Sequence, residues 1–136
     1  MPLDIQAVEQ VYARFGAALT AGDAEILLAI LSSDAEICPP NAPPVRGKSA
    51  AHTWVKDFLK RYGVTDLRLA MRKWQIGDRV AMFAYDATGN YVPRDGRPRV
   101  PFSQNYVDVW TLRADHSWKI CMHTWNSSQP GPSIWE

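Results

Sequence analysis

The sequence predicts an α+β fold in which three N-terminal helices pack on one side of a strongly curved antiparallel sheet. Two observations lead to this class. Up to Tyr62, most apolar residues recur at three- and four-residue steps, which is typical of amphipathic helices. From Val64 onward they alternate with polar residues or form short β-branched and aromatic runs, which is typical of strands. No repeat or linker divides the 136 residues, so residues 1–136 are predicted to form a single domain.

Two helices are predicted at the start of the chain. Leu3–Ala21 has one apolar stripe, and Gly22 is suited to end it as a C-terminal cap. Asp23 can then cap a second helix, Ala24–Leu31. Because the connection is short, the two helices are expected to fold back on each other. The stripe of the first helix consists of Ile5, Val8, Tyr12, Phe15 and Leu19.

A short strand and a third helix follow. Ser32–Asp34 breaks the second helix, and Ala35–Cys38 is predicted as a strand that ends in a proline-rich loop. Ser49 can cap the third helix, which runs to Tyr62. Its apolar stripe consists of Trp54, Val55, Phe58, Leu59 and Tyr62.

Four strands are predicted in the second half of the chain. Leu67–Arg72 alternates, so one face is expected to be buried, whereas Arg79–Thr88 is apolar on both faces and therefore central. Gly89–Pro101 is predicted as a connection; its arginines form either a solvated charged run or a cover over an acidic ligand. The last two strands are Tyr106–Leu112 and Trp118–Asn126, and 127–136 is predicted as a loose tail.

The last two predicted strands contain a carboxylate, an imidazole and several large aromatic residues. Alternate residues of a strand share a face, so Tyr106, Asp108 and Trp110 are expected to point together. On the last strand, His123 shares a face with Trp125, whereas Ile120 takes the opposite face unless a bulge swaps them. The hairpin is therefore predicted to bring a carboxylate, an imidazole and large aromatic rings near one space.

The element order resembles that of the nuclear-transport-factor-2-like superfamily, also known as the ketosteroid-isomerase-like or SnoaL-like fold. The matching stretches are Phe15–Asp23, Ser33–Pro39 with Arg46-Gly47, Ser117–Ile120 and Trp125–Ser127. The resemblance implies a conical barrel with an apolar pocket at its wide end, and often a homodimer formed through the sheet. Members of this superfamily include isomerases, cyclases, hydratases, epoxide hydrolases and non-enzymes, so the fold alone leaves the activity open.

Ketosteroid isomerases use a carboxylate base, a tyrosine donor and a protonated aspartate. By resemblance, Phe15 stands where they carry the tyrosine, with Tyr12 one turn earlier, and Cys38 stands where they carry the base. Asp108 matches the donor aspartate. Because one of the three positions is kept, the resemblance does not favour steroid isomerisation by that mechanism.

The candidate catalytic residues are Asp108 and His123, because a pocket-facing carboxylate and an imidazole suit acid–base chemistry. The alternative is an exposed aspartate and a histidine that only forms hydrogen bonds. Cys38 is read as a small hydrophobic residue rather than a nucleophile. The candidate ligand-binding residues are aromatic and could equally be core: Tyr12, Phe15, Trp54, Phe58, Phe83, Tyr85, Tyr106, Trp110 and Trp125.

The composition and the absence of certain motifs exclude several classes of function. A net charge of +1 provides no field that would recruit nucleic acid or an anionic membrane. The chain shows neither a signal peptide nor a membrane span, so a cytoplasmic protein with reduced thiols is expected. No phosphate loop, dinucleotide fingerprint or metal-binding spacing implies a cofactor or metal. We expect an isomerase, cyclase or lyase for a flat, largely apolar polyketide-, terpenoid- or steroid-like molecule; the alternatives are a non-catalytic ligand-binding protein and a dimeric assembly domain.

Overall fold

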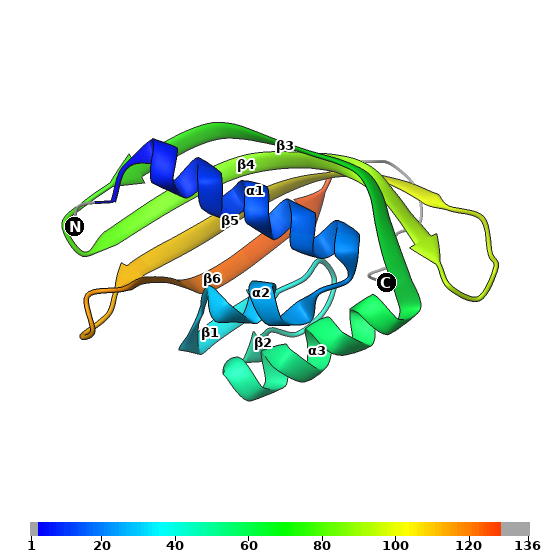
Figure 1. The fold of residues 1–136 in the computed structure, drawn as a ribbon, viewed down its shortest axis with the longest axis horizontal. Coiled ribbons are helices and arrows are strands. Elements are labelled where there is room, and N and C mark those ends of the chain that lie inside the picture. Colours follow the sequence, from blue (N-terminus) through cyan, green and yellow to red (C-terminus); the bar gives the residue numbers. More distant parts are fainter. Residues whose placement is uncertain (1–2, 129–136) are drawn as a thin grey trace.

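The computed structural model describes residues 3–128, and Figure 1 shows three helices lying on one face of a curved sheet. The six strands are in the order β2-β1-β6-β5-β4-β3. The α+β class and the three helices are confirmed. The helices are α1 (Ile5–Ala21), α2 (Ala24–Ala29) and α3 (Lys48–Arg61); the strands are β1 (Leu31–Cys38), β2 (Val45–Arg46), β3 (Tyr62–Ile76), β4 (Val80–Pro93), β5 (Val100–Leu112) and β6 (Trp118–Ser127).

The sheet differs from the expected closed, antiparallel cone in two respects. β1 runs parallel to β6, so the sheet is mixed. Within residues 3–128, β2 and β3 form the two edges and do not pair with each other, so the sheet is open. The sheet curves nevertheless, and register shifts in the β3–β4 pair, between Thr65 and Arg68 and between Met71 and Lys73, provide bends of the kind that bulges produce.

Several predicted boundaries were wrong because pairing extends the strands. β1 begins at Leu31, so the predicted break at Ser32–Asp34 is strand. β4 and β5 run through most of the predicted connection Gly89–Pro101, and only residues 94–99 join them. Gly89 is not a turn residue: a Cβ there would lie 2.8 Å from the ring of Phe102, its cross-strand partner.

The helix caps and the end of the last strand agree only in part with the predictions. Gly22 has φ 74° and ends α1, and the Asp23 side chain accepts a hydrogen bond from the Glu25 amide, as predicted. α3 begins after Gly47, so Ser49 lies inside the helix rather than capping it. Of the predicted loose tail, Ser127 belongs to β6, and the Ser128 amide donates to the carbonyl oxygen of Ser103. Residues 129–136 lie outside the described residues.

Arg94 has a structural role. From the sequence, the arginines of this segment were expected only to be solvated or to cover an acidic ligand. Its Nε donates to the carbonyl oxygen of Leu59 at 2.9 Å, in the last turn of α3. Its guanidinium also lies close to Gly22 and Gly63, where a Cβ would be 3.8 Å away from it. A cation at a helix C-terminus satisfies a carbonyl and complements the helix dipole. Arg97, by contrast, forms an exposed ion pair with Asp95.

Replacing Arg94 with methionine is expected to lower the free energy of unfolding by about 1–2 kcal/mol, because a charged hydrogen bond to a helix end is lost. Urea denaturation monitored by circular dichroism measures the change. Arg97→Met is the matched control and should leave the midpoint unchanged, since exposed ion pairs contribute little. Equal effects of the two substitutions would contradict the role given to Arg94.

Candidate active site

The β5–β6 pairing places Asp108 and His123 directly opposite each other. Between Val109 and Trp110 the register shifts, and Cys121 is the extra residue on β6. This bulge brings Ile120 onto the same inner face as His123, so the expectation of opposite faces was wrong. His123 itself faces the interior, as predicted.

Asp108 is fully buried, and its carboxyl oxygens have three hydrogen-bond partners. Its Oδ1 lies 2.6 Å from His123 Nδ1. Its Oδ2 accepts from the hydroxyls of Tyr12, at 2.6 Å, and Tyr85, at 2.9 Å. A buried carboxylate is costly unless it is hydrogen-bonded, and three donors satisfy the ionised form. With the Asp108 carboxylate as the acceptor, His123 donates from Nδ1 and carries its lone pair on Nε2.

The two tyrosines remain protonated donors over the ordinary pH range. Burial raises the pKa of Tyr12, and the negative charge of Asp108 raises it further. Burial, followed by the charge of Asp108, likewise raises the pKa of Tyr85. Trp110 donates from Nε1 to the Tyr12 hydroxyl oxygen at 3.2 Å. The phenols predicted as ligand donors are thus directed to the carboxylate, which they hold in its acceptor form.

The raised tyrosine pKa values predict how stability responds to alkaline pH. Burial also raises the pKa of Tyr106, so three of the five tyrosines keep their protons longer in the folded than in the unfolded chain. Their contribution is complete below about pH 10, the unfolded value, and is lost as the pH rises above it. Phenolate absorbance should show at least three groups, Tyr12, Tyr85 and Tyr106, that ionise only on unfolding. Ionisation of all five tyrosines in the folded protein would contradict this burial.

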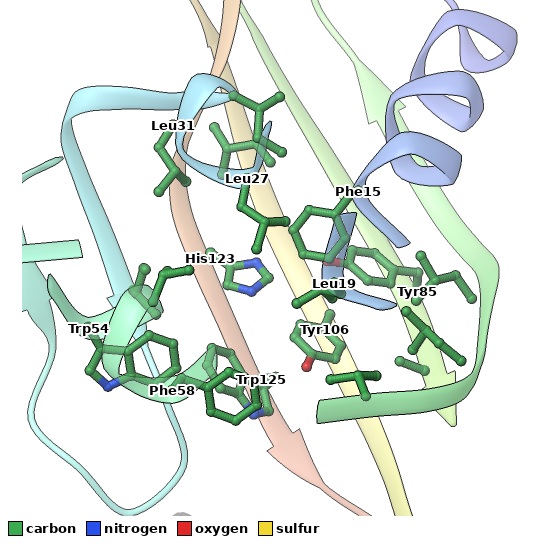
Figure 2. A pocket seen from close by; sticks show the side chains of 18 of the residues that line it. Phe15, Leu19, Leu27, Leu31, Trp54, Phe58, Tyr85, Tyr106, His123 and Trp125 are labelled. Atoms are coloured by element: carbon green, nitrogen blue, oxygen red, sulfur yellow. The ribbon is translucent and has the colours of Figure 1, made fainter. Parts of the chain in front are cut away.

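An apolar cavity of about 80 Å³ lies between the helices and the inner face of the sheet. This volume is several times the roughly 10–15 Å³ that one water needs and about half the roughly 150 Å³ of a cavity that binds benzene, so the side chains that line it must move apart before a ring-sized ligand can enter. Figure 2 shows the His123 imidazole among the lining side chains, with Phe15 on one side and Trp125 on the other. Within the described residues, Nε2 of His123 has no hydrogen-bond partner, and this nitrogen is available to a ligand.

The predicted ligand-binding residues divide into two groups. Tyr12, Phe83 and Trp110 do not line this cavity, although Tyr12 lines a second hollow between α1 and β3. They pack behind the cavity, where the Tyr12 ring lies 6.4 Å from Phe83 and 6.0 Å from Trp110, because they surround the carboxylate of Asp108. The residues that do line the cavity are Phe15, Trp54, Phe58, Tyr85, Tyr106 and Trp125.

Three aromatic residues on neighbouring strands form one wall of the cavity. Tyr85 pairs with Tyr106 across β4–β5, and Tyr106 pairs with Trp125 across β5–β6. The Tyr85 and Tyr106 rings are parallel, with centroids 5.1 Å apart, and Trp125 lies 5.2 Å from Tyr106. Such cross-strand aromatic pairs stabilise a sheet and present a flat apolar surface.

Gln104 has no role predicted from the sequence, whereas Cys38 is predicted to be a small hydrophobic residue rather than a nucleophile. Gln104 is only 2% exposed and accepts a hydrogen bond from Tyr106. Strand alternation places Gln104 on the same face of β5 as Tyr106 and Asp108, two and four residues before them, but that position alone does not indicate a role. Cys38 does not line the cavity, whereas its neighbour Ile37 does. Burial raises the pKa of the Cys38 thiol, which opposes a nucleophilic role.

Within 3–128, no three His, Cys, Asp or Glu side chains gather in a way that could hold a metal ion. None of the helices in that part of the chain has the length and apolar character needed to cross a bilayer.

Known proteins share this architecture. A sequence model of the SnoaL-like domain matches residues 11–120. A ketosteroid isomerase-like protein from Erwinia carotovora atroseptica SCRI1043 has a TM-score of 0.80 at 15% identity, over 90% of this chain and 94% of that one. A candidate scytalone dehydratase from Novosphingobium aromaticivorans DSM 12444 has a TM-score of 0.80 at 15% identity, over 92% and 84%. A search of curated proteins finds no match.

A third similar structure is described by the name of the superfamily. It is a nuclear-transport-factor-2-like superfamily protein from Salmonella enterica serovar Typhimurium LT2, with a TM-score of 0.76 at 14% identity, over 95% of this chain and 94% of that one. At identities of 14–15%, structural similarity establishes a shared fold but not a shared activity. The predicted resemblance to this superfamily is confirmed.

Proposed function

Because the chain belongs to the SnoaL-like domain family, we propose that it is a small-molecule enzyme that performs cofactor-free acid–base chemistry. The substrate class is a flat, largely apolar compound of polyketide, terpenoid or steroid type. One observation carries the proposal: His123 Nδ1 lies 2.6 Å from the buried carboxylate of Asp108, while the imidazole lines an apolar cavity. The reaction types that suit this arrangement are isomerisation, cyclisation and dehydration.

In the proposed reaction, His123 Nε2 removes a proton from an acidic C–H or O–H bond of the bound substrate. The electron pair of that bond stays on the substrate, and the imidazole becomes imidazolium. Asp108 remains ionised and stabilises this cation through Nδ1. The same proton then returns to another substrate atom in an isomerisation, or to a departing hydroxyl that leaves as water in a dehydration. Apolar walls exclude bulk water, which would otherwise compete for the proton.

A thermal-shift screen followed by product analysis tests the proposal. Flat mono- and polycyclic compounds are first screened for those that raise the melting temperature, since a ligand of the folded state stabilises it. Each hit is then incubated with the protein and analysed by mass spectrometry and NMR for an isomer or a dehydrated product. Hits that stabilise the protein but return unchanged would instead support a non-catalytic binding protein, the alternative that the apolar cavity also favours.

We also propose a homodimer formed through the outer face of the sheet. Ala84 pairs with Val107, and Met82 pairs with Val109, on the face opposite Asp108. Val107 is 36% exposed, which is high for a β-branched residue in the middle of a sheet. Sedimentation velocity at micromolar concentration distinguishes the predicted dimer from a monomer.

A further inference from the structure

A second buried polar network lies beside the Asp108–His123 pair. Gln104 accepts a hydrogen bond at Oε1 from the Tyr106 hydroxyl, at 2.6 Å. Its Nε2 donates to the hydroxyl oxygen of Tyr91, at 2.8 Å. Gln104 is 2% exposed and does not line the cavity, so it does not contact a ligand there. The Tyr91 hydroxyl also lies 3.1 Å from Gln104 Oε1, and because hydroxyls both donate and accept, the buried amide stays hydrogen-bonded to Tyr106 and Tyr91 whichever way round it lies.

The group that Gln104 fixes is in contact with the proposed base. The Tyr106 ring stacks on the His123 imidazole, with centroids 5.1 Å apart and planes 29° apart. The imidazole also contacts Phe15, with centroids 6.0 Å and planes 59° apart, and Trp125, with centroids 5.1 Å and planes 48° apart. The hydrogen bond to Asp108 holds only the Nδ1 edge of the imidazole and leaves the tilt of its plane open. The packed rings limit that tilt, and the tilt decides where Nε2 points.

We propose that Gln104 is a positioning residue which, by anchoring the hydroxyl of Tyr106, sets the orientation of the His123 imidazole and therefore the direction of Nε2. The inference rests on the proposed base role of His123. A phenylalanine at position 106 would supply the same ring but no hydroxyl, so it could slide along the imidazole. Proton transfer depends steeply on geometry, and a small misplacement of the base lowers the rate of the chemical step.

The first test uses NMR and requires no substrate. Gln104→Met keeps the length of the side chain but removes the acceptor, and Tyr106→Phe removes the donor alone. In each variant we expect weaker nuclear Overhauser contacts between the rings of residue 106 and His123, and broadened His123 imidazole signals. The double variant should show no further change, because both substitutions break one interaction. Tyr106→Phe removes a single hydroxyl, so it gives a result even where Gln104→Met fails to fold.

Ser32→Ala is the matched control. Ser32 is 3% exposed and donates to Asp34, so its loss removes a partly buried hydrogen bond without touching the rings. It should leave the His123 signals as they are in the wild type. With a substrate in hand, Gln104→Met and Tyr106→Phe should each lower kcat by about tenfold with little change in KM.

Unchanged His123 signals in both Gln104→Met and Tyr106→Phe would overturn the inference, and Gln104 would then be a buried structural amide. This outcome is separate from failure of the proposed function. A protein that turns over no compound can still show the coupling between residue 104 and the imidazole.

Discussion

Replacing His123 with glutamine is expected to lower kcat by a factor of about 10²–10⁴ on any substrate that the ligand screen identifies. Glutamine fills similar space and can accept a hydrogen bond, but it cannot take and return a proton. KM should change little, because the apolar walls of the cavity supply most of the contacts with a flat ligand. Steady-state kinetics with the purified variant measure both quantities.

His52→Gln is the matched control for this substitution. His52 lies on α3, partly exposed, with Nε2 3.4 Å from Glu25 Oε1, and it does not line the cavity. Its replacement should leave kcat and KM at their wild-type values. A His123→Gln variant that keeps full activity, with a folded circular dichroism spectrum, would remove His123 from the chemistry.

Replacing Asp108 with alanine is expected to have the largest effect on stability, a loss of about 3–5 kcal/mol. The hydroxyls of Tyr12 and Tyr85 and the Nδ1–H of His123 would lose their shared acceptor in a buried site. Each unsatisfied buried donor costs about 1–3 kcal/mol, and the vacated space adds to the cost. Urea denaturation measures the change in the free energy of unfolding.

The Asp108→Asn variant distinguishes the contribution of Asp108 to folding stability from its contribution to turnover. Its amide oxygen can still accept from the two phenols, so we expect a smaller loss of stability, about 1–3 kcal/mol. Its amide nitrogen, however, cannot accept from Nδ1–H, so the imidazole loses the partner that sets its tautomer. Turnover should then fall while the fold is kept. Asp57→Ala, on the exposed side of α3, is the control and should change stability by no more than about 0.5 kcal/mol.

The pairing of Asp108 with His123 was predictable because strand alternation and a short turn restrict the hairpin to few registers. The bulge at Cys121 was not, since one extra residue changes which residues share a face without altering the composition of the strand. The hydroxyls that hold Asp108 come from α1 and β4, far away in sequence. Tyr12 reaches the carboxylate only because of how α1 crosses the sheet, which local pattern does not encode.

The errors in the fold have a similar origin. Gly89 was predicted to begin a connection, but its missing Cβ makes room for the ring of Phe102 within a long hairpin. The expected barrel came from the resemblance, whereas the open sheet follows from which strands pair. The parallel contact of β1 with β6 joins residues at opposite ends of the chain, and no local signal reports such a contact. Gln104 was missed because a single amide within an aromatic strand has no distinctive motif.

The most direct test of the account is the protonation of the two imidazole nitrogens of His123, measured by ¹⁵N NMR of the protein with neutral histidines. The account predicts a proton on Nδ1, shared with Asp108, and a bare Nε2 facing the cavity. A proton on Nε2 with a bare Nδ1 would mean that Asp108 is itself protonated and donates. That result would contradict the assignment of His123 as a base held by an ionised carboxylate.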